Sequence, residues 1–275
     1  MIKRVTLITG ASSGIGAATA KKLAAPGETL LLHARGGTAG EKIELLHIVA
    51  ESVVNEGAEA HVYLTDLGNV GAGRDIVNWA IETCGQLDRV VSNAGFALNT
   101  RVGEVSRDEL DNSYRVIMGA FFDIVDSALP YLKKSKCGRL VATSSFVASQ
   151  VPGGQLFPVT AMAKGALESF AKTLAVQLAA DNITVNCVVP GFTEKEKNGH
   201  SALSSESWAE AAAMTPNLRL AKPSDIAAAL PTPGIFDLGM GARLKAVDAT
   251  KEAASRKVDL AHESADRRLS TLEKT

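Results

Sequence analysis

Short apolar runs alternate with longer stretches of helical periodicity over the first 190 residues of the chain. The apolar runs lie at residues 5–9, 29–33, 60–64, 87–92, 139–143 and 183–189. The stretches between them, at residues 17–25, 41–56, 75–83, 107–134 and 159–180, favour helices. Nearly continuous apolar strands are typical of a parallel sheet that is buried on both faces. The alternation therefore predicts an α/β fold with a doubly wound parallel sheet flanked by helices.

No linker interrupts the first 190 residues and no internal repeat is found, so one domain is expected, at residues 1–230. Residues 192–222 are rich in serine, alanine and glutamate and show no strand signal, which indicates either a helical lid over a site or a surface excursion without function. Residues 231–275 begin with a proline- and glycine-rich segment and are expected to form an atypical C-terminal extension without a clear seventh strand. The sheet edge beside the sixth strand is then either open or covered by this tail.

Composition and charge narrow the classes of function. The 275 residues are 46% hydrophobic and 21% charged, which is typical of a globular protein with a large core. The 29 basic and 30 acidic residues give a net charge of −1, so neither nucleic acid nor an anionic membrane surface is an expected partner. Three distant cysteines, Cys84, Cys137 and Cys187, indicate reduced thiols, and no metal site is expected. Without a signal sequence or an apolar stretch of membrane-spanning length, a cytoplasmic protein is expected.

A glycine-rich turn joins the first predicted strand to the first predicted helix. Residues 9–16 read TGASSGIG, with Gly10, Gly14 and Gly16 at GxxxGxG spacing. Gly10 can turn the chain, Gly14 can let the backbone approach a pyrophosphate, and Gly16 can let the helix pack closely on the strand. The unpaired amides and the positive dipole end of the helix favour a phosphate. The turn opens a βαβ unit and therefore predicts a dinucleotide-binding site.

Further motifs follow this turn in order, and together they resemble the short-chain dehydrogenase/reductase family. The chain has Asp66-Leu67 after the third predicted strand, Asn93-Ala94-Gly95 after the fourth, and Pro190-Gly191 with Thr193 after the sixth. The resemblance implies a Rossmann-type fold, an adenine contact near Asp66, and a nicotinamide contact from residues 190–193. Besides Arg35 and Lys164, which are discussed below, the predicted cofactor-binding residues are Gly10, Ser12, Ser13, Gly14, Ile15, Gly16, Asp66, Leu67, Asn93, Ala94, Gly95, Pro190, Gly191 and Thr193.

The end of the second predicted strand indicates which dinucleotide is preferred. An acidic residue there would bond the ribose 2′-hydroxyl of NAD, whereas this chain has Ala34-Arg35. The Arg35 guanidinium can pair with a 2′-phosphate in a bidentate manner, and Ser12 and Ser13 can add hydroxyl donors. NADP(H) is therefore expected rather than NAD(H), unless Arg35 only ends a strand in solvent.

The resemblance also implies a catalytic set, of which this chain keeps two of four members. Family members use tyrosine and lysine in a YxxxK helix, a serine after the fifth strand, and an asparagine on the preceding long helix. Here residues 160–164 read TAMAK, so Lys164 is present, Thr160 replaces the tyrosine, and Val116 stands at the asparagine position. By alignment Ser145 holds the substrate oxygen, although Ser144 is adjacent, and Lys164 binds the nicotinamide ribose. The expected catalytic residues are Ser145, Lys164 and Thr160.

The loss of tyrosine leaves the proton donor open. Thr160 can donate a hydrogen bond, but an aliphatic alcohol does not titrate near neutral pH, so general acid catalysis worth about 10²- to 10⁴-fold needs another source. The alternatives are Thr160 itself, a water polarised by Lys164 and Ser145, the substrate, and His200 in the predicted lid.

Two functions remain as expectations. The first is an NADP(H)-dependent oxidoreductase with a modified site, which reduces a carbonyl or oxidises an alcohol. The second is a catalytically silent NADP(H)-binding relative that acts as a sensor or scaffold. The substrate is expected to be a small molecule, and a partly apolar one if the lid side chains Phe192, Leu203, Trp208 and Met214 face it rather than pack the lid. A homodimer or higher homo-oligomer through residues 107–134 and 159–180 is expected.

Overall fold

The computed structural model of the protein describes residues 3–36, 41–152, 156–194, 205–215, 217–229 and 243–244. In that part of the chain seven strands form one sheet in the order β3-β2-β1-β4-β5-β6-β7, and every neighbouring pair is parallel. The strands are β1 (Arg4–Ile8), β2 (Glu28–Ala34), β3 (Glu59–Leu64), β4 (Arg89–Ser92), β5 (Arg139–Thr143), β6 (Thr184–Val188) and β7 (Arg243–Leu244). The predicted doubly wound α/β fold is confirmed, and all six predicted strands form.

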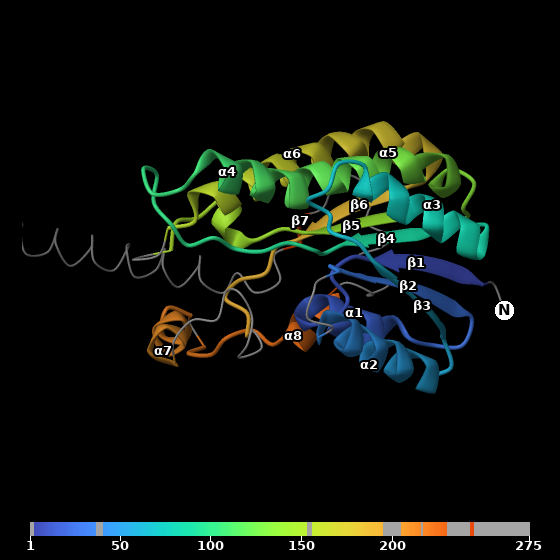
Figure 1. Ribbon diagram of the computed structural model, residues 1–275, viewed down its shortest axis with the longest axis horizontal. Helices are drawn as coiled ribbons and strands as arrows, with labels where there is room; N and C mark the ends of the chain where they lie inside the picture. The colour runs from blue at the N-terminus through green and yellow to red at the C-terminus, as the bar shows by residue number, and fades with distance from the viewer. Residues whose placement is uncertain are drawn as a thin grey trace, which may run out of the picture.

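Helices cover both faces of the sheet (Figure 1). The helices of one face are α3 (Ala72–Cys84), α4 (Arg107–Tyr114), α5 (Ala120–Leu132) and α6 (Pro158–Leu178). Those of the other face are α1 (Gly14–Leu23), α2 (Glu41–Asn55) and α8 (Pro223–Ala229). Successive strand side chains enter different cores, so that Leu31 packs with Phe121 of α5, while Leu30 and Leu32 pack with Leu46 of α2. None of the described helices is long and apolar enough to cross a lipid bilayer.

The helical stretch predicted at residues 107–134 is not one regular α-helix. A π-helical segment, η1 (Arg115–Gly119), separates α4 from α5, and the Ala120 amide donates to the Arg115 carbonyl five residues earlier. A π turn holds one more residue than an α turn, which the spacing of apolar residues does not reveal. The segment includes Val116, so the backbone is irregular at the position where the family pattern has asparagine.

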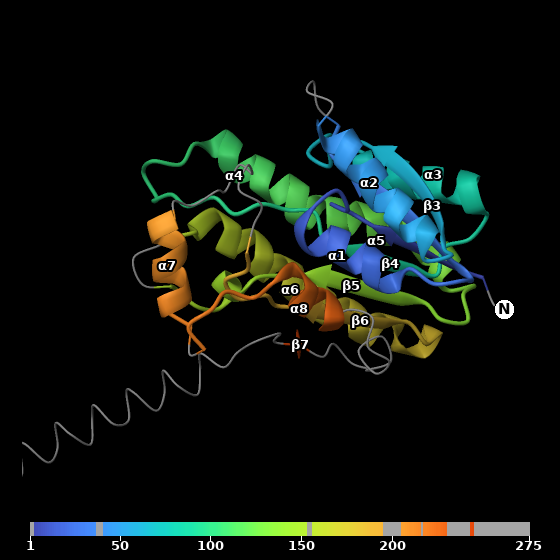
Figure 2. The ribbon, with the colours of Figure 1, turned by 90° about the horizontal axis from the view of Figure 1, so that it is seen from below.

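The C-terminal prediction is corrected at one point, because a seventh strand does form. The two residues of β7 pair with Cys187 and Val188 of β6 and so cover that stretch of the sheet edge. A strand of two residues leaves no recognisable apolar run in the sequence. The other residues of the predicted 231–275 extension lie outside the described residues, as do His200 and Leu203. Within the predicted lid, α7 (Ser205–Ala213) lies beyond the carboxyl ends of the strands (Figure 2).

The sheet order positions the candidate site. From β1 the chain builds outward through β2 and β3 on one side and through β4, β5 and β6 on the other. The turn after β1 and the loop after β4 therefore meet at the carboxyl ends of neighbouring strands. In doubly wound sheets this switch point is where ligands bind.

Candidate functional site

The glycine turn after β1 has the backbone that its sequence predicts. Gly10 and Gly14 have φ angles of +68° and +56°, in the left-handed region that favours glycine. A Cβ at Gly16 would overlap the carbonyl oxygen of Gly10, whereas the space around Gly14 is open to at least 4 Å. Ser13 is the N-cap of α1, but its side chain makes no capping bond, so it leaves the first amides of the helix to other acceptors. The turn is therefore shaped to receive an anion.

A hydrogen-bond network joins the ends of β1, β4 and β5. The Thr9 hydroxyl accepts from the backbone amides of Asn93 at 2.9 Å and Ala94 at 3.0 Å. The Asn93 side-chain amide donates to the carbonyls of Thr9 at 3.2 Å and Gly10 at 3.3 Å, and its oxygen accepts from the Thr143 hydroxyl at 3.2 Å. We call Thr9, Asn93, Ala94 and Thr143 the strand-end lock. It brings the predicted residues of the glycine turn and of the loop after β4 together.

His33 supports the glycine turn from β2, a role that the sequence analysis missed. Its Nε2 lies 2.9 Å from the Thr65 carbonyl, and its Nδ1 accepts from the Gly10 amide at 3.4 Å. Burial lowers the pKa of His33, which favours the neutral ring that can donate at one nitrogen and accept at the other. A histidine near the end of a buried strand, two residues before the predicted cofactor residue Arg35, was the available signal.

The predicted adenine and phosphate residues lie around this turn. Arg35 follows β2 and is exposed. Asp66 follows β3 and accepts from the Gly68 amide at 2.8 Å, which fixes a turn, and Leu67 is buried in a small cluster with Ala94 packed against it. Ser12 is buried, and the Ile15 carbonyl accepts from a threonine one turn later in α1.

Lys164 projects from α6 to the loops after β4 and β5. Its Nζ donates to the Thr143 carbonyl at 2.6 Å, and a Cβ added at Gly95 would lie 3.4 Å from the same nitrogen. The side chain is buried, and burial lowers the pKa of Lys164 to about 8, although Cys187 and Glu168 act in the opposite direction. The structure thus places an amine that titrates near neutral pH beside the strand-end lock.

The two serines after β5 have different surroundings. Ser144 is 3% exposed, and its hydroxyl donates to Glu168 Oε1 at 2.7 Å. Ser145 is half-buried, and its oxygen accepts from the Val147 amide at 3.5 Å at the start of η2 (Phe146–Ala148). Ser145 is therefore the serine with a proton left to donate, which favours the alignment's choice. Glu168 was missed, although an acidic residue one helical turn after Lys164 is a usable signal.

Thr160 is tied to the loop after β4. Its hydroxyl oxygen accepts from the Leu98 amide at 3.0 Å, and the residue is 2% exposed. Val116 lies in η1, and its side chain lies close to Gly68. A Cβ added at Gly68 would lie 3.4 Å from a Val116 methyl group. Thus neither residue at the substituted positions supplies a group that titrates, and Thr160 holds a loop in place.

The segment after β6 packs across the loop after β5. The Pro190 carbonyl accepts from the Phe146 amide at 3.0 Å, and the rings of Phe146 and Phe192 meet edge to face at 4.8 Å. The Thr193 hydroxyl donates to the Gly191 carbonyl at 3.0 Å, and Thr193 also forms a bridge with a residue near the start of α8. The contact between the rings shows that Phe192 packs against the domain.

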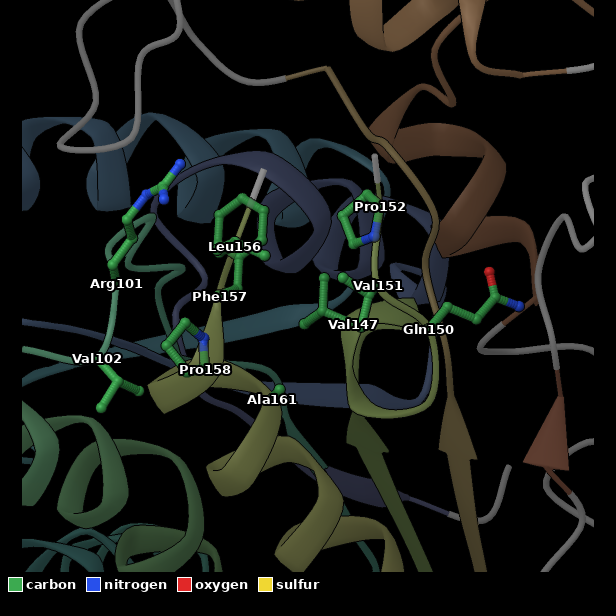
Figure 3. A pocket seen from close by; sticks show the side chains of 10 residues that line it. All are labelled: Arg101, Val102, Val147, Gln150, Val151, Pro152, Leu156, Phe157, Pro158 and Ala161. Carbon is green, nitrogen blue, oxygen red and sulfur yellow. The ribbon is translucent and has the colours of Figure 1, made fainter. Parts of the chain in front are cut away.

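An apolar pocket of about 420 Å³ is lined by Val147, whose amide bonds Ser145, and by Ala161, the residue after Thr160 (Figure 3). Its walls come from the loop after β4, from η2 and the residues that follow it, and from the start of α6. The lining residues are Arg101, Val102, Val147, Gln150, Val151, Pro152, Leu156, Phe157, Pro158 and Ala161. A volume of this size is typical of small-molecule sites.

Comparisons with known proteins agree with this geometry. A family profile described as enoyl-(acyl carrier protein) reductase matches residues 10–231. The chain is 35% identical to a versicolorin reductase of Emericella nidulans over 189 residues, which are 68% of each chain. Its structure resembles a 3-oxoacyl-(acyl-carrier-protein) reductase of Agrobacterium tumefaciens C58 with NADP bound, at a TM-score of 0.77 and 26% identity, over 89% of this chain and 93% of the other. It also resembles an angucycline C-6 ketoreductase with bound NADP, at a TM-score of 0.78 and 28% identity, over 90% and 95% of the two chains.

Proposed function

The chain belongs to the short-chain dehydrogenase/reductase family of oxidoreductases, and on that premise we propose that it is an NADP(H)-dependent reductase with a modified active site. It reduces a carbonyl of a small molecule to an alcohol, or oxidises the alcohol in the reverse direction. Relatives that are named reductases, and similar structures with NADP bound, support this reaction class. The observation that carries the proposal is the strand-end lock, which holds the glycine turn beside Lys164.

The residues of the site fit a bound dinucleotide. Gly16 leaves no room for a side chain, Gly14 faces open space, and Ser13 does not cap α1, so the turn can take a pyrophosphate. Arg35 is exposed at the end of β2, where it would meet a 2′-phosphate, and Lys164 would bind the ribose hydroxyls. When bound, the cofactor supplies the hydride, and the chain supplies position and the proton.

Ser145 and Lys164 carry the polar chemistry of this proposal. The Ser145 hydroxyl accepts from Val147 and can donate its own proton to the carbonyl oxygen of the substrate. Lys164 holds a proton at Nζ, and because its pKa is lowered to about 8, it can release this proton near neutral pH. We assign proton donation to Lys164, directly or through a water, while Thr160 positions the loop after β4.

A catalytically silent NADP(H)-binding protein is the second candidate. The observation that favours it is the contact between Thr160 and Leu98, which occupies the hydroxyl oxygen at the position where the family has a phenol. Under this alternative the dinucleotide is a ligand for sensing or scaffolding, and the residues that bind it keep the roles given above.

Cofactor binding is tested first, by titration of the protein with NADPH and with NADH. We expect NADPH to bind more tightly, and Arg35→Gln to weaken NADPH by about tenfold while leaving NADH unchanged, because a charged hydrogen-bonded pair is lost. Arg74→Gln, at an exposed arginine of α3, is the matched control. Equal affinities for the two cofactors would contradict the role of Arg35.

Activity is then measured as oxidation of NADPH with a panel of aldehydes, ketones and quinones, in the parent and in the double variant Thr160→Tyr, Val116→Asn. Turnover by the parent supports the reductase. If the parent binds NADPH and is inactive while the double variant turns over, the silent alternative replaces it. Thr160→Val, which removes the hydroxyl without adding a phenol, controls for loss of the contact with Leu98.

We also propose a homodimer through α4, α5 and α6. Four large side chains on these helices are unburied in the single chain: Tyr114 at 47%, Phe122 at 48%, Met162 at 56% and Val176 at 72% exposed. Such exposed apolar groups on neighbouring elements are typical of an interface. Light scattering tests this, with Phe122→Glu expected to shift the dimer to a monomer and Val54→Glu, on α2 at the other face of the sheet, expected to leave it intact.

A cytoplasmic location is part of the proposal. The three cysteines, Cys84, Cys137 and Cys187, are free thiols, which is typical of a reducing compartment. Fractionation of the source cells with a fluorescent fusion of the full chain tests it.

A further inference from the structure

The walls of the apolar pocket are held together by three hydrogen bonds. The Leu98 amide donates to the Thr160 hydroxyl at 3.0 Å, and the Thr100 amide donates to the Leu156 carbonyl at 3.1 Å. The Leu156 amide donates in turn to the Asn99 side-chain oxygen at 3.3 Å. These bonds join the loop after β4 to the residues that precede and begin α6. Because these bonds fix two of the three walls before a ligand arrives, that part of the pocket is preformed, which reduces the entropy cost of binding.

Three of the side chains that line the pocket are large and apolar but exposed to solvent. Val102 is 83% exposed, Val151 is 79% exposed and Leu156 is 38% exposed. Single exposed apolar residues are ordinary, but these three come from two separate segments and converge on one pocket. A ligand with an apolar body would cover them. The pocket volume of about 420 Å³, and the bond between its lining residue Val147 and Ser145, favour a small molecule over a protein segment.

Arg101 adds a cation to these apolar walls. Among the described residues that line the pocket, it alone has an ionisable side chain, and it is exposed. In the described part of the chain no carboxylate lies within ion-pair distance of its guanidinium. In the view of Figure 3, Arg101 and Gln150 lie on opposite sides of the apolar side chains. A planar guanidinium suits a carboxylate, which it can bind through two parallel hydrogen bonds.

We propose that this pocket selects substrates that combine an apolar body with a carboxylate group, and that Arg101 binds the carboxylate. Val102, Val151 and Leu156 then cover the apolar body, and the reacting carbonyl lies toward Ser145. Turnover of such a substrate rests on the proposed function, whereas its binding does not. The inference is therefore tested by binding alone.

The experiment is calorimetric titration of the protein, in the absence and in the presence of excess NADP⁺, with 2-naphthoate and with its methyl ester as probes. In the parent protein we expect the acid to bind more tightly than the ester. Arg101→Gln should weaken the acid by about three- to fivefold, as for the loss of an exposed ion pair, and leave the ester unchanged. Val151→Ser should weaken both probes by about threefold, because it removes apolar contact from both. Added salt should weaken only the acid.

Matched controls separate these effects from general ones. Arg74→Gln and Val70→Ser change exposed residues that are not among the residues lining the pocket, and neither should alter the affinity of either probe. Circular dichroism of each variant checks the fold. Equal loss of acid and ester in Arg101→Gln, or no loss of either probe in Val151→Ser, would overturn the inference. If a keto-naphthoate binds as expected but is not reduced, the proposed function fails and the pocket assignment stands.

Discussion

Replacement of Lys164 by methionine should remove a specific pH dependence from the stability of the protein. Burial lowers the pKa of Lys164 from 10.5 to about 8 in the folded state. Between these two values the unfolded chain binds more protons than the folded one, so the free energy of unfolding rises with pH. A difference of about 2.5 pKa units, at about 1.36 kcal/mol each, gives about 3 kcal/mol in full. About 2 kcal/mol of it is gained by about pH 9.5, and almost none below about pH 7, where both states hold the proton.

Urea unfolding at about pH 7 and about pH 9.5 measures this effect. We compare how far the urea midpoint shifts from about pH 7 to about pH 9.5 in each protein. For an m-value of about 3 kcal/mol/M, the upward shift should be about 0.7 M larger in the parent than in Lys164→Met. Subtracting the variant removes the contributions of all other titrating groups. Lys172→Met, at an exposed lysine of the same helix, should follow the parent at both pH values. Parallel pH profiles for the parent and Lys164→Met would refute the lowered pKa, and with it the assignment of Lys164 as proton donor.

Three further predictions concern single contacts. Gly16→Ala should destabilise the protein more than Gly14→Ala and abolish measurable NADPH binding, because of these two glycines only Gly16 has backbone in the place of a Cβ. Equal thermal midpoints for the two variants would contradict this. Thr160→Val should cost about 1–3 kcal/mol in urea unfolding, since the Leu98 amide loses its acceptor, and Thr160→Ser should recover most of it. Ser144→Ala should cost about 1.5–3 kcal/mol by removing a donor from the buried Glu168, and an unchanged midpoint would show that the bond contributes nothing.

The strands and the glycine turn could be predicted because their constraints are local. A buried parallel strand needs a continuous apolar run, and the turn needs glycine where the φ angle is positive or where a Cβ would overlap. Both requirements are visible in a few consecutive residues. The π turn at η1 and the two residues of β7 leave no such local trace, so the sequence predicted one continuous helix and no seventh strand.

The candidate site was predicted less completely, because its contacts join distant segments. Thr160 and Leu98 are 62 positions apart, and nothing near either residue indicates that they bond. The choice between Ser144 and Ser145 depended on Glu168, which lies 24 positions after Ser144. The different roles of Ser144 and Ser145 could therefore be assigned only from the structure.

The span of the strand-end lock also bears on how the chain folds. The Thr9 hydroxyl bonds the amides of residues 84 and 85 positions later, and β1 pairs with β4 across the same interval. Closing so long a loop costs entropy before its contacts form, which is why non-local topologies fold slowly. During synthesis, the first βαβ unit therefore leaves the ribosome before the residues that complete its nucleotide turn exist. A nascent chain gains affinity for a dinucleotide only after β4 has docked, and from then on the ligand stabilises both halves of the sheet together by mass action.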